Sequence, residues 1–161
     1  MSRIMVVIGI AVVAFAVAAC GGTSGGGYGG GGGSTASSSS GKGSVALAST
    51  KLGKVLVDGK GRTLYLFEAD KGTMSTCDGA CASAWPPLTT SGKPTAGAGV
   101  VAANLGTAKR ADGTTGVTYD GHPLYTYAGD AAAGQTTGQA INGFGAEWYV
   151  LSAAGSAIET G

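Results

Sequence analysis

The sequence predicts a small domain that is all-β or nearly so, built as two antiparallel, hairpin-based repeats and preceded by a signal peptide and a disordered linker. The first observation behind this prediction is an internal repeat, because residues 57–70 resemble residues 119–130 and Trp85 aligns with Trp148. The offset between copies is steady (125 minus 65 at a tyrosine, 148 minus 85 at the tryptophan), which indicates duplication. The second observation is that each copy opens with β-branched residues running into Asp-Gly, a hairpin signal.

The strand after each Asp-Gly turn alternates between an aromatic and an aliphatic face. Tyr65 and Phe67 face one side in the first copy, with leucines opposite, and Tyr125 and Tyr127 repeat the aromatic face in the second. We expect these rings, with the two tryptophans, to pack in the core. An exposed stacking surface for a sugar, a peptide or a flat cofactor is the alternative.

An aspartate ends each of these strands, just ahead of a glycine-rich loop. Asp70 and Asp130 are expected to accept backbone N–H groups there, as in an Asx turn. Asp58 and Asp120 occupy the preceding hairpin turns in the same symmetric way. The alternative to this structural role is that one pair of carboxylates hydrolyses a glycosidic bond, which requires the two groups to flank that bond.

The chain divides into segments whose compositions differ. Within the folded part, residues 80–85 are expected to be helical for a turn or two, stopped by two prolines, and residues 147–152 to form the last strand. The expected segments are a signal peptide at 1–19, a lipidated cysteine and Gly/Ser-rich tether at 20–46, the duplicated β domain at 47–155 (repeat one about 52–90, repeat two about 114–153) and a tail at 156–161.

The first twenty residues indicate export. An apolar run of sixteen residues follows Arg3 and would span about 24 Å as a helix, short of the roughly 30 Å hydrocarbon core, although an uncleaved membrane anchor is the alternative. The run ends in Val-Ala-Ala-Cys, which resembles the lipobox of bacterial lipoproteins. That resemblance implies a diacylglyceryl group on the thiol of Cys20, cleavage before it, and an extracytoplasmic protein of the cell envelope held to the membrane by its lipid.

Two motifs in the folded part resemble a known family. The Tyr-x-aromatic-x-x-Asp motif occurs at 65–70 and 125–130, and a C-x3-C pair at Cys77 and Cys81 runs on to Trp85-Pro-Pro-Leu. Together they resemble the bacterial secreted-repeat lipoprotein family over about residues 47–153. The function of that family is unassigned, so the resemblance implies a fold and a location but no activity.

If Cys20 carries lipid, two thiols remain, those of Cys77 and Cys81. An exported protein enters an oxidising compartment, where such a pair can form a disulfide. With their Cα atoms about 6 Å apart they are within disulfide range, and we expect a structural disulfide. A redox pair or two metal thiolates are the alternatives.

His122 is the only histidine, and it precedes a proline in a hairpin turn, where a solvated side chain is expected. The alternative is an extracytoplasmic metal- or haem-linked redox carrier that uses His122, Met74 and the Tyr/Asp motifs.

Charge and composition narrow the function classes. With Arg3 removed, nine Lys/Arg face nine Asp/Glu, and this balance argues against a nucleic-acid partner. No catalytic constellation is evident, so the sequence predicts a non-enzymatic binding or structural module without a cofactor beyond the lipid on Cys20. Its partners are expected to be the membrane, through that lipid, and an unidentified protein or small molecule.

Overall fold

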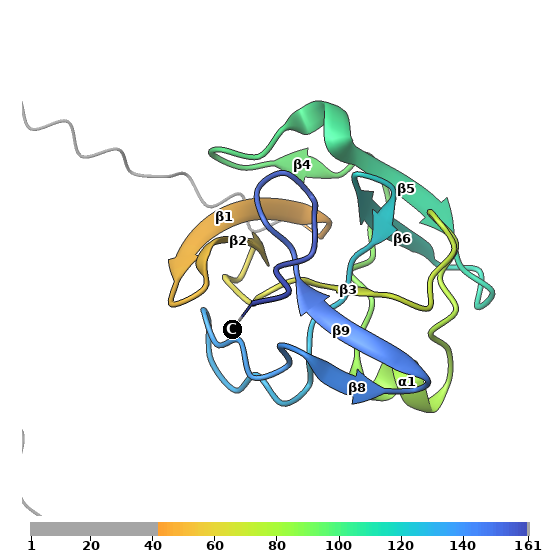
Figure 1. Ribbon diagram of the computed structural model, residues 1–161. Coiled ribbons are helices and arrows are strands. Elements are labelled where there is room, and N and C mark those ends of the chain that lie inside the picture. The colour runs from red at the N-terminus through yellow and green to blue at the C-terminus, as the bar shows by residue number, and fades with distance from the viewer. Residues whose placement is uncertain (1–41, 161) are drawn as a thin grey trace, which may run out of the picture. The chain divides into compact units, whose positions relative to one another are not determined.

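The computed structural model describes residues 42–160, so the signal peptide, Cys20 and most of the tether lie outside the described residues. The described part is nearly all-β, as the sequence predicts, and its three sheets have the strand orders β2-β1-β4, β3-β9-β8 and β5-β6-β7. Figure 1 shows β3 and β9 crossing the middle of the domain, with the β1–β2 hairpin on one side and the β5–β6 hairpin on the other. The elements are β1 (Ser44–Thr50), β2 (Gly53–Asp58), β3 (Tyr65–Phe67), α1 (Ala80–Ala84), β4 (Thr95–Ala96), η1 (Ala102–Asn104), β5 (Leu105–Lys109), β6 (Thr115–Tyr119), β7 (His122–Pro123), β8 (Ile141–Gly143) and β9 (Ala146–Val150).

Each repeat begins one strand earlier than the sequence suggests. The expected repeats start at about 52 and 114, whereas β1 pairs with β2 and β5 pairs with β6 ahead of those points. These two strands, Ser-Val-Ala-Leu-Ala-Ser-Thr and Leu-Gly-Thr-Ala-Lys, consist mostly of small residues, which give a weak strand pattern. They are strands because each pairs along its length with the strand that follows it, β2 or β6, and Val45 of β1 is buried in the core.

The two ends of the domain also differ from the expected boundaries. β1 begins at Ser44, inside the segment assigned to the tether. At the other end, the tail pairs with the last strand, because Leu151 bridges Ala157 and the Ile158 N–H donates to the Val150 carbonyl at 2.9 Å. The pairing of the tail involves only one or two residues, which is too short to give a periodic pattern in the sequence.

The two repeats exchange their last strands around a central pair of tyrosines. Tyr65 and Tyr125 donate their backbone N–H groups to each other's carbonyls at 2.8 and 3.0 Å. β9 of the second repeat pairs with β3 of the first, with Val150 opposite Tyr65. Pro87 of the first repeat bridges Tyr125 of the second, the corresponding pairing in the other direction. Each repeat therefore completes the sheet of the other, and neither has a full set of strands of its own.

Two buried layers lie on the two faces of the central strands. Tyr65 and Phe67 belong to one layer and Leu64 and Leu66 to the other, which confirms the predicted alternation. Burial of each large apolar side chain stabilises the fold by about 1.5–3 kcal/mol. The aromatic layer also contains Val55, Val57, Cys77, Cys81, Trp85, Tyr125, Trp148 and Val150, and the aliphatic layer contains Val45, Leu56, Val117, Tyr119, Leu124, Tyr149 and Leu151.

Local signals produce the turns where they were expected. Asp120 and Gly121 have φ angles of 49° and 84° and join β6 to β7, with Tyr119 opposite His122, as a two-residue primed turn requires. In the first repeat the Asp58 carboxylate accepts the backbone N–H groups of Lys60 and Arg62 at 2.8 and 3.0 Å and closes a longer turn. The helix α1 ends just before the two prolines, as predicted.

Candidate functional site

The family motif forms two hydrogen bonds that cross between the repeats. The Tyr65 hydroxyl of the first repeat donates to Oδ2 of Asp130 in the second at 2.8 Å. The Tyr125 hydroxyl of the second repeat donates to Oδ2 of Asp70 in the first at 2.7 Å. Both tyrosines are fully buried. The tyrosine and the aspartate of one motif thus never pair with each other; each holds the opposite repeat.

The remaining oxygen of each motif carboxylate organises a loop. Oδ1 of Asp70 accepts the backbone N–H and the hydroxyl of Thr76 at 2.7 and 3.0 Å. Oδ1 of Asp130 accepts the same two groups of Thr137 at 2.9 and 2.6 Å. Each acid accepts a backbone N–H group as expected, but from a residue six or seven positions further on and not in an Asx turn. Both oxygens of both carboxylates therefore accept hydrogen bonds within the fold.

Burial makes both motif tyrosines weaker acids. Desolvation, together with the hydrogen bond to Asp130, raises the pKa of Tyr65 well above its usual value of 10.0. Desolvation also raises the pKa of Tyr125; the hydrogen bond between its hydroxyl and Ser75 opposes this rise, and Asp70 adds to it. Both hydroxyls therefore remain protonated donors across the physiological pH range.

Four aromatic rings form a continuous column through the aromatic layer. Phe67 stacks on Trp148 with centroids 4.1 Å apart, Trp148 stacks on Trp85 at 4.0 Å and 2°, and Trp85 lies 4.3 Å from Tyr127. The motif tyrosines contact this column edge-on, since Tyr65 lies 5.3 Å from Trp85 and Tyr125 lies 5.1 Å from Trp148. Such geometries are favourable for aromatic pairs. The rings expected in the core are buried there, and only Tyr127 at the end of the column is partly exposed.

The cysteine loop is held by a buried arginine, Arg110. Cys77 and Cys81 form the expected disulfide, with Cα atoms 5.2 Å apart. Arg110 is 7% exposed and donates from Nη2 to the Cys77 carbonyl at 2.6 Å and from Nη1 to Ser75 Oγ at 2.5 Å. Ser75 Oγ lies 2.6 Å from the Tyr125 hydroxyl, so the guanidinium joins the loop to the motif. No local pattern around Arg110 indicates that its charge is buried.

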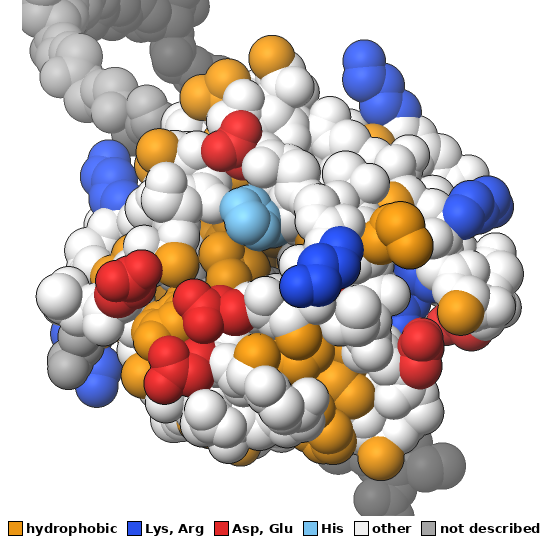
Figure 2. All heavy atoms as spheres, turned by 45° about the vertical axis from the view of Figure 1, so that its right-hand side comes forward, with side chains coloured by type: hydrophobic (Ala, Val, Ile, Leu, Met, Phe, Trp, Pro, Cys, Tyr) orange, Lys and Arg blue, Asp and Glu red, His pale blue; other side chains and the backbone are white. Residues whose placement is uncertain are grey.

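The two residues proposed for a metal or haem lie in different surroundings. His122 is partly buried and lines an open groove of about 560 Å³ with Leu66, Phe67, Glu68 and Asp70. Figure 2 shows the histidine on a face where acidic side chains gather, beside a depression with a hydrophobic floor. Met74 is 69% exposed and is not among the residues lining this groove. Within residues 42–160 no group of three His, Cys, Asp or Glu side chains is arranged to hold a metal ion.

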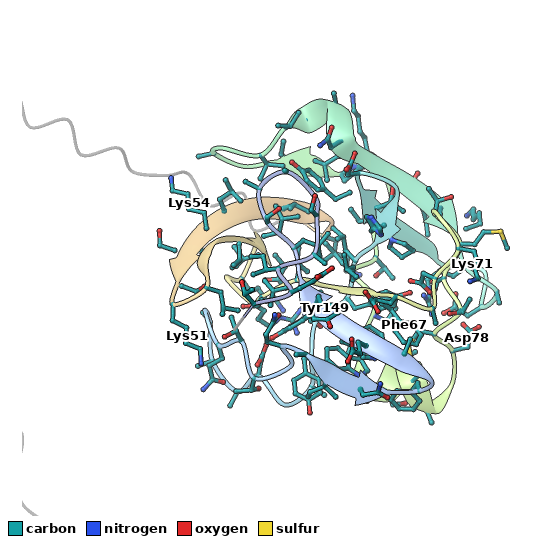
Figure 3. The ribbon with its side chains drawn as sticks, viewed as in Figure 1. Lys51, Lys54, Phe67, Lys71, Asp78 and Tyr149 are labelled. Atoms are coloured by element: carbon teal, nitrogen blue, oxygen red, sulfur yellow. A yellow bond between two sulfur atoms is a disulfide. The ribbon has the colours of Figure 1, made fainter. Side chains whose placement is uncertain are left out.

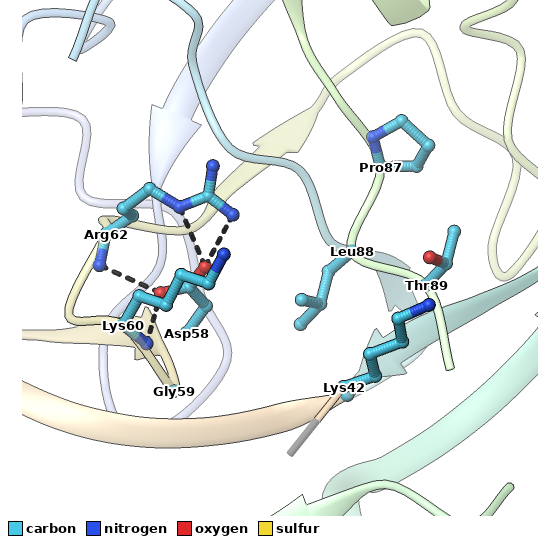
Figure 4. Close-up of a pocket in the computed structure, with 9 residues that line it drawn as sticks. Lys42, Asp58, Gly59, Lys60, Arg62, Pro87, Leu88 and Thr89 are labelled. Atoms are coloured by element: carbon cyan, nitrogen blue, oxygen red, sulfur yellow. Dashed lines mark hydrogen bonds and ion pairs between the residues drawn. The ribbon is translucent and has the colours of Figure 1, made fainter. Parts of the chain in front are cut away.

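A second hollow carries positive charge. It has a volume of about 190 Å³ and is bordered by the turn at 58–62, by Lys42 at the start of the described chain and by residues 87–89. Figure 4 shows Arg62 paired with Asp58, at 2.8 Å between Nη2 and Oδ2, with Lys60 beside that pair and Lys42 near Thr89. We call this hollow the basic pocket.

Comparison with protein families places the chain. A family described as a secreted repeat of unknown function matches residues 46–89 and 106–152, which together make up more than half of the sequence. The chain belongs to this family. No curated protein and no solved structure gives a significant match.

The two matched segments correspond to the two repeats seen in the structure. Each match starts within the early strand, β1 or β5, and includes the residues that pair with the other repeat, namely Pro87 in the first match and β9 in the second. The secreted repeat is therefore defined by sequence as one unit but completed in space by its copy. Among residues 42–160 of this secreted repeat protein, no helix is long and apolar enough to span a membrane.

Proposed function

We propose that this secreted repeat protein is a lipoprotein of the cell envelope, anchored through a lipid on Cys20, whose folded part is a non-catalytic binding or structural module. The sequence before the fold supports the anchor, because two small residues precede Cys20 as a lipoprotein signal requires. Two or more acyl chains are enough for stable membrane binding.

The exchange of tyrosine–aspartate hydrogen bonds carries the proposal of a non-catalytic module. The side chains most suited to chemistry in the motif, Tyr65, Tyr125, Asp70 and Asp130, are used to fasten one repeat to the other. Trp85, Trp148 and Phe67 are likewise core residues, and the ring of Tyr127 packs against them. Ligand recognition is then left to the surface hollows, and the motif supplies the rigid frame that presents them.

The anchor is tested by growing cells with a labelled fatty acid and comparing wild type with Cys20→Ser. We expect label on the wild-type chain, and loss of label together with release or incomplete processing in the variant. A chain with both Cys77→Ala and Cys81→Ala is the matched control and should keep its label. Equal labelling of wild type and Cys20→Ser would overturn the proposed anchor.

The non-catalytic module is tested separately against the redox carrier that His122 and Met74 suggested. Protein purified from its native envelope is analysed for iron and copper and by absorption spectroscopy. We expect neither a stoichiometric metal nor a haem band. Stoichiometric metal that is lost in His122→Ala but kept in a Lys93→Ala control would replace the module by the carrier.

A further inference from the structure

The basic pocket brings together positive charges that have no carboxylate to balance them. Arg62 is bound to Asp58 through both Nε and Nη2, at 2.9 and 2.8 Å, so these two charges neutralise each other. Lys42 and Lys60 line the same hollow, are exposed and form no ion pair with any residue in 42–160. Since Asp58 is the only acid in the lining, the pocket has an excess of two positive charges.

The fold determines this clustering. Lys60 lies in the turn that Asp58 closes, and its backbone N–H is held by that carboxylate at 2.8 Å. Lys42 is brought to the same place because β1 runs antiparallel to β2, with Val45 opposite Asp58. The third wall, Pro87 to Thr89, belongs to the segment that crosses to the second repeat. The pocket therefore exists only when the two repeats are assembled.

The walls indicate the class of ligand. Two ammonium groups favour an anion with several charged oxygens, such as a phosphate or a phosphodiester, because each ammonium can then donate to an oxygen. The Thr89 hydroxyl adds a polar group at the same rim. Pro87 and Leu88 form an apolar wall beside them, suited to carbon attached to the anion. A volume of about 190 Å³ has room for a phosphate group but not for a long polymer.

We propose that the basic pocket binds a phosphate group, either as a free phosphate or as the phosphodiester of an anionic lipid headgroup. Lys42 and Lys60 contribute the charge, and the Arg62–Asp58 pair holds the turn that positions Lys60. This site is independent of the lipid on Cys20, because every residue in it lies within 42–160.

The test uses the mature chain in a non-ionic detergent and titrates it with inorganic phosphate while backbone amide shifts are recorded by NMR. We expect saturable shifts at Lys60 and Thr89. The double variant Lys42→Ala/Lys60→Ala should bind about tenfold more weakly, since each exposed charge pair is worth a few-fold in affinity. Raising the salt concentration should weaken binding by screening.

A matched control removes the same charge elsewhere. Lys51 and Lys54 are both exposed at the far end of the β1–β2 hairpin, where Figure 3 shows them pointing outward. Lys51→Ala/Lys54→Ala should bind phosphate as the wild type does. Equal weakening in both double variants would show a nonspecific charge effect and overturn the site, as would shifts that do not saturate or that avoid the pocket.

A second arm distinguishes the two sources of phosphate. Soluble short-chain phosphatidylglycerol is titrated beside inorganic phosphate, with short-chain phosphatidylcholine as the zwitterionic comparison. Tighter binding of the phosphatidylglycerol, lost in Lys42→Ala/Lys60→Ala, identifies a lipid headgroup site. Tighter binding of inorganic phosphate identifies a free phosphate site, and failure of all three ligands to bind refutes the proposal.

Discussion

Removing one hydroxyl should reveal how strongly the two repeats hold each other. Tyr65→Phe keeps the ring against Trp85 but deletes the donor to Asp130, which lies 2.8 Å away and is 9% exposed. It also deletes the acceptor for the Gly138 N–H, at 3.3 Å. The variant therefore leaves a buried carboxylate oxygen and a buried N–H without their partner.

We expect the loss of free energy of unfolding in this variant to be large for the removal of a single oxygen atom. A hydrogen bond to a charged group contributes about 1.5–3 kcal/mol, and leaving the buried partner unsatisfied places the cost in the upper part of that range, at about 2–3 kcal/mol. For a domain of this size the melting temperature should fall by about 8–12 °C.

Urea unfolding followed by tryptophan fluorescence measures this loss, because both tryptophans lie in the stacked column. Tyr127→Phe is the matched control. Its ring belongs to the same column, it is partly exposed, and its hydroxyl forms no hydrogen bond with residues 42–160, so its effect should stay within about 0.5 kcal/mol. Equal stability of the two variants would refute the view that the crossed hydrogen bonds fasten the repeats together.

Three further predictions follow from the same geometry. Because the pKa values of Tyr65 and Tyr125 are raised in the fold, the stability that they contribute is complete below the unfolded value of 10.0 and is lost as pH rises above it, by about 1.4 kcal/mol per pH unit for each tyrosine. Thermal melts across alkaline pH should show this slope, and Tyr65→Phe should remove the share of one tyrosine from it. Replacing Cys77 and Cys81 together by alanine should lower the free energy of unfolding by about 2 kcal/mol in urea titrations, and thiol titration of the folded wild-type domain should find neither cysteine reactive. The two repeats produced as separate polypeptides should each give the circular dichroism of an unfolded chain and should recover β structure on mixing, whereas cooperative folding of either one alone would contradict the exchange of strands.

Short-range patterns in the sequence were sufficient for much of the fold. The alternation of Tyr65 and Phe67 with leucines predicted the two buried layers, and Asp-Gly at 120–121 predicted a tight turn. The spacing of the cysteines predicted their disulfide. Each of these features depends on residues that are neighbours along the chain, so local geometry is enough to specify it.

The candidate sites depended on contacts between distant residues. Arg110 reads as a surface charge, and only the packing of β5 and β6 against the cysteine loop shows that it is buried on the Cys77 carbonyl. Lys42 and Lys60 are separated along the chain and line the same hollow because β1 and β2 are antiparallel. Neither position carries a local signal of its role.

What the sequence by itself determined is the duplication, the all-β class, the turns and the inward direction of the motif rings. What only the tertiary structure decided is the partner of each motif residue, namely Asp130 for Tyr65 and Asp70 for Tyr125. The physical reason is that two nearly equivalent repeats offer each strand and each carboxylate two chemically similar partners. The choice between them depends on the path of the long connections and the packing of the whole core, which no local pattern records.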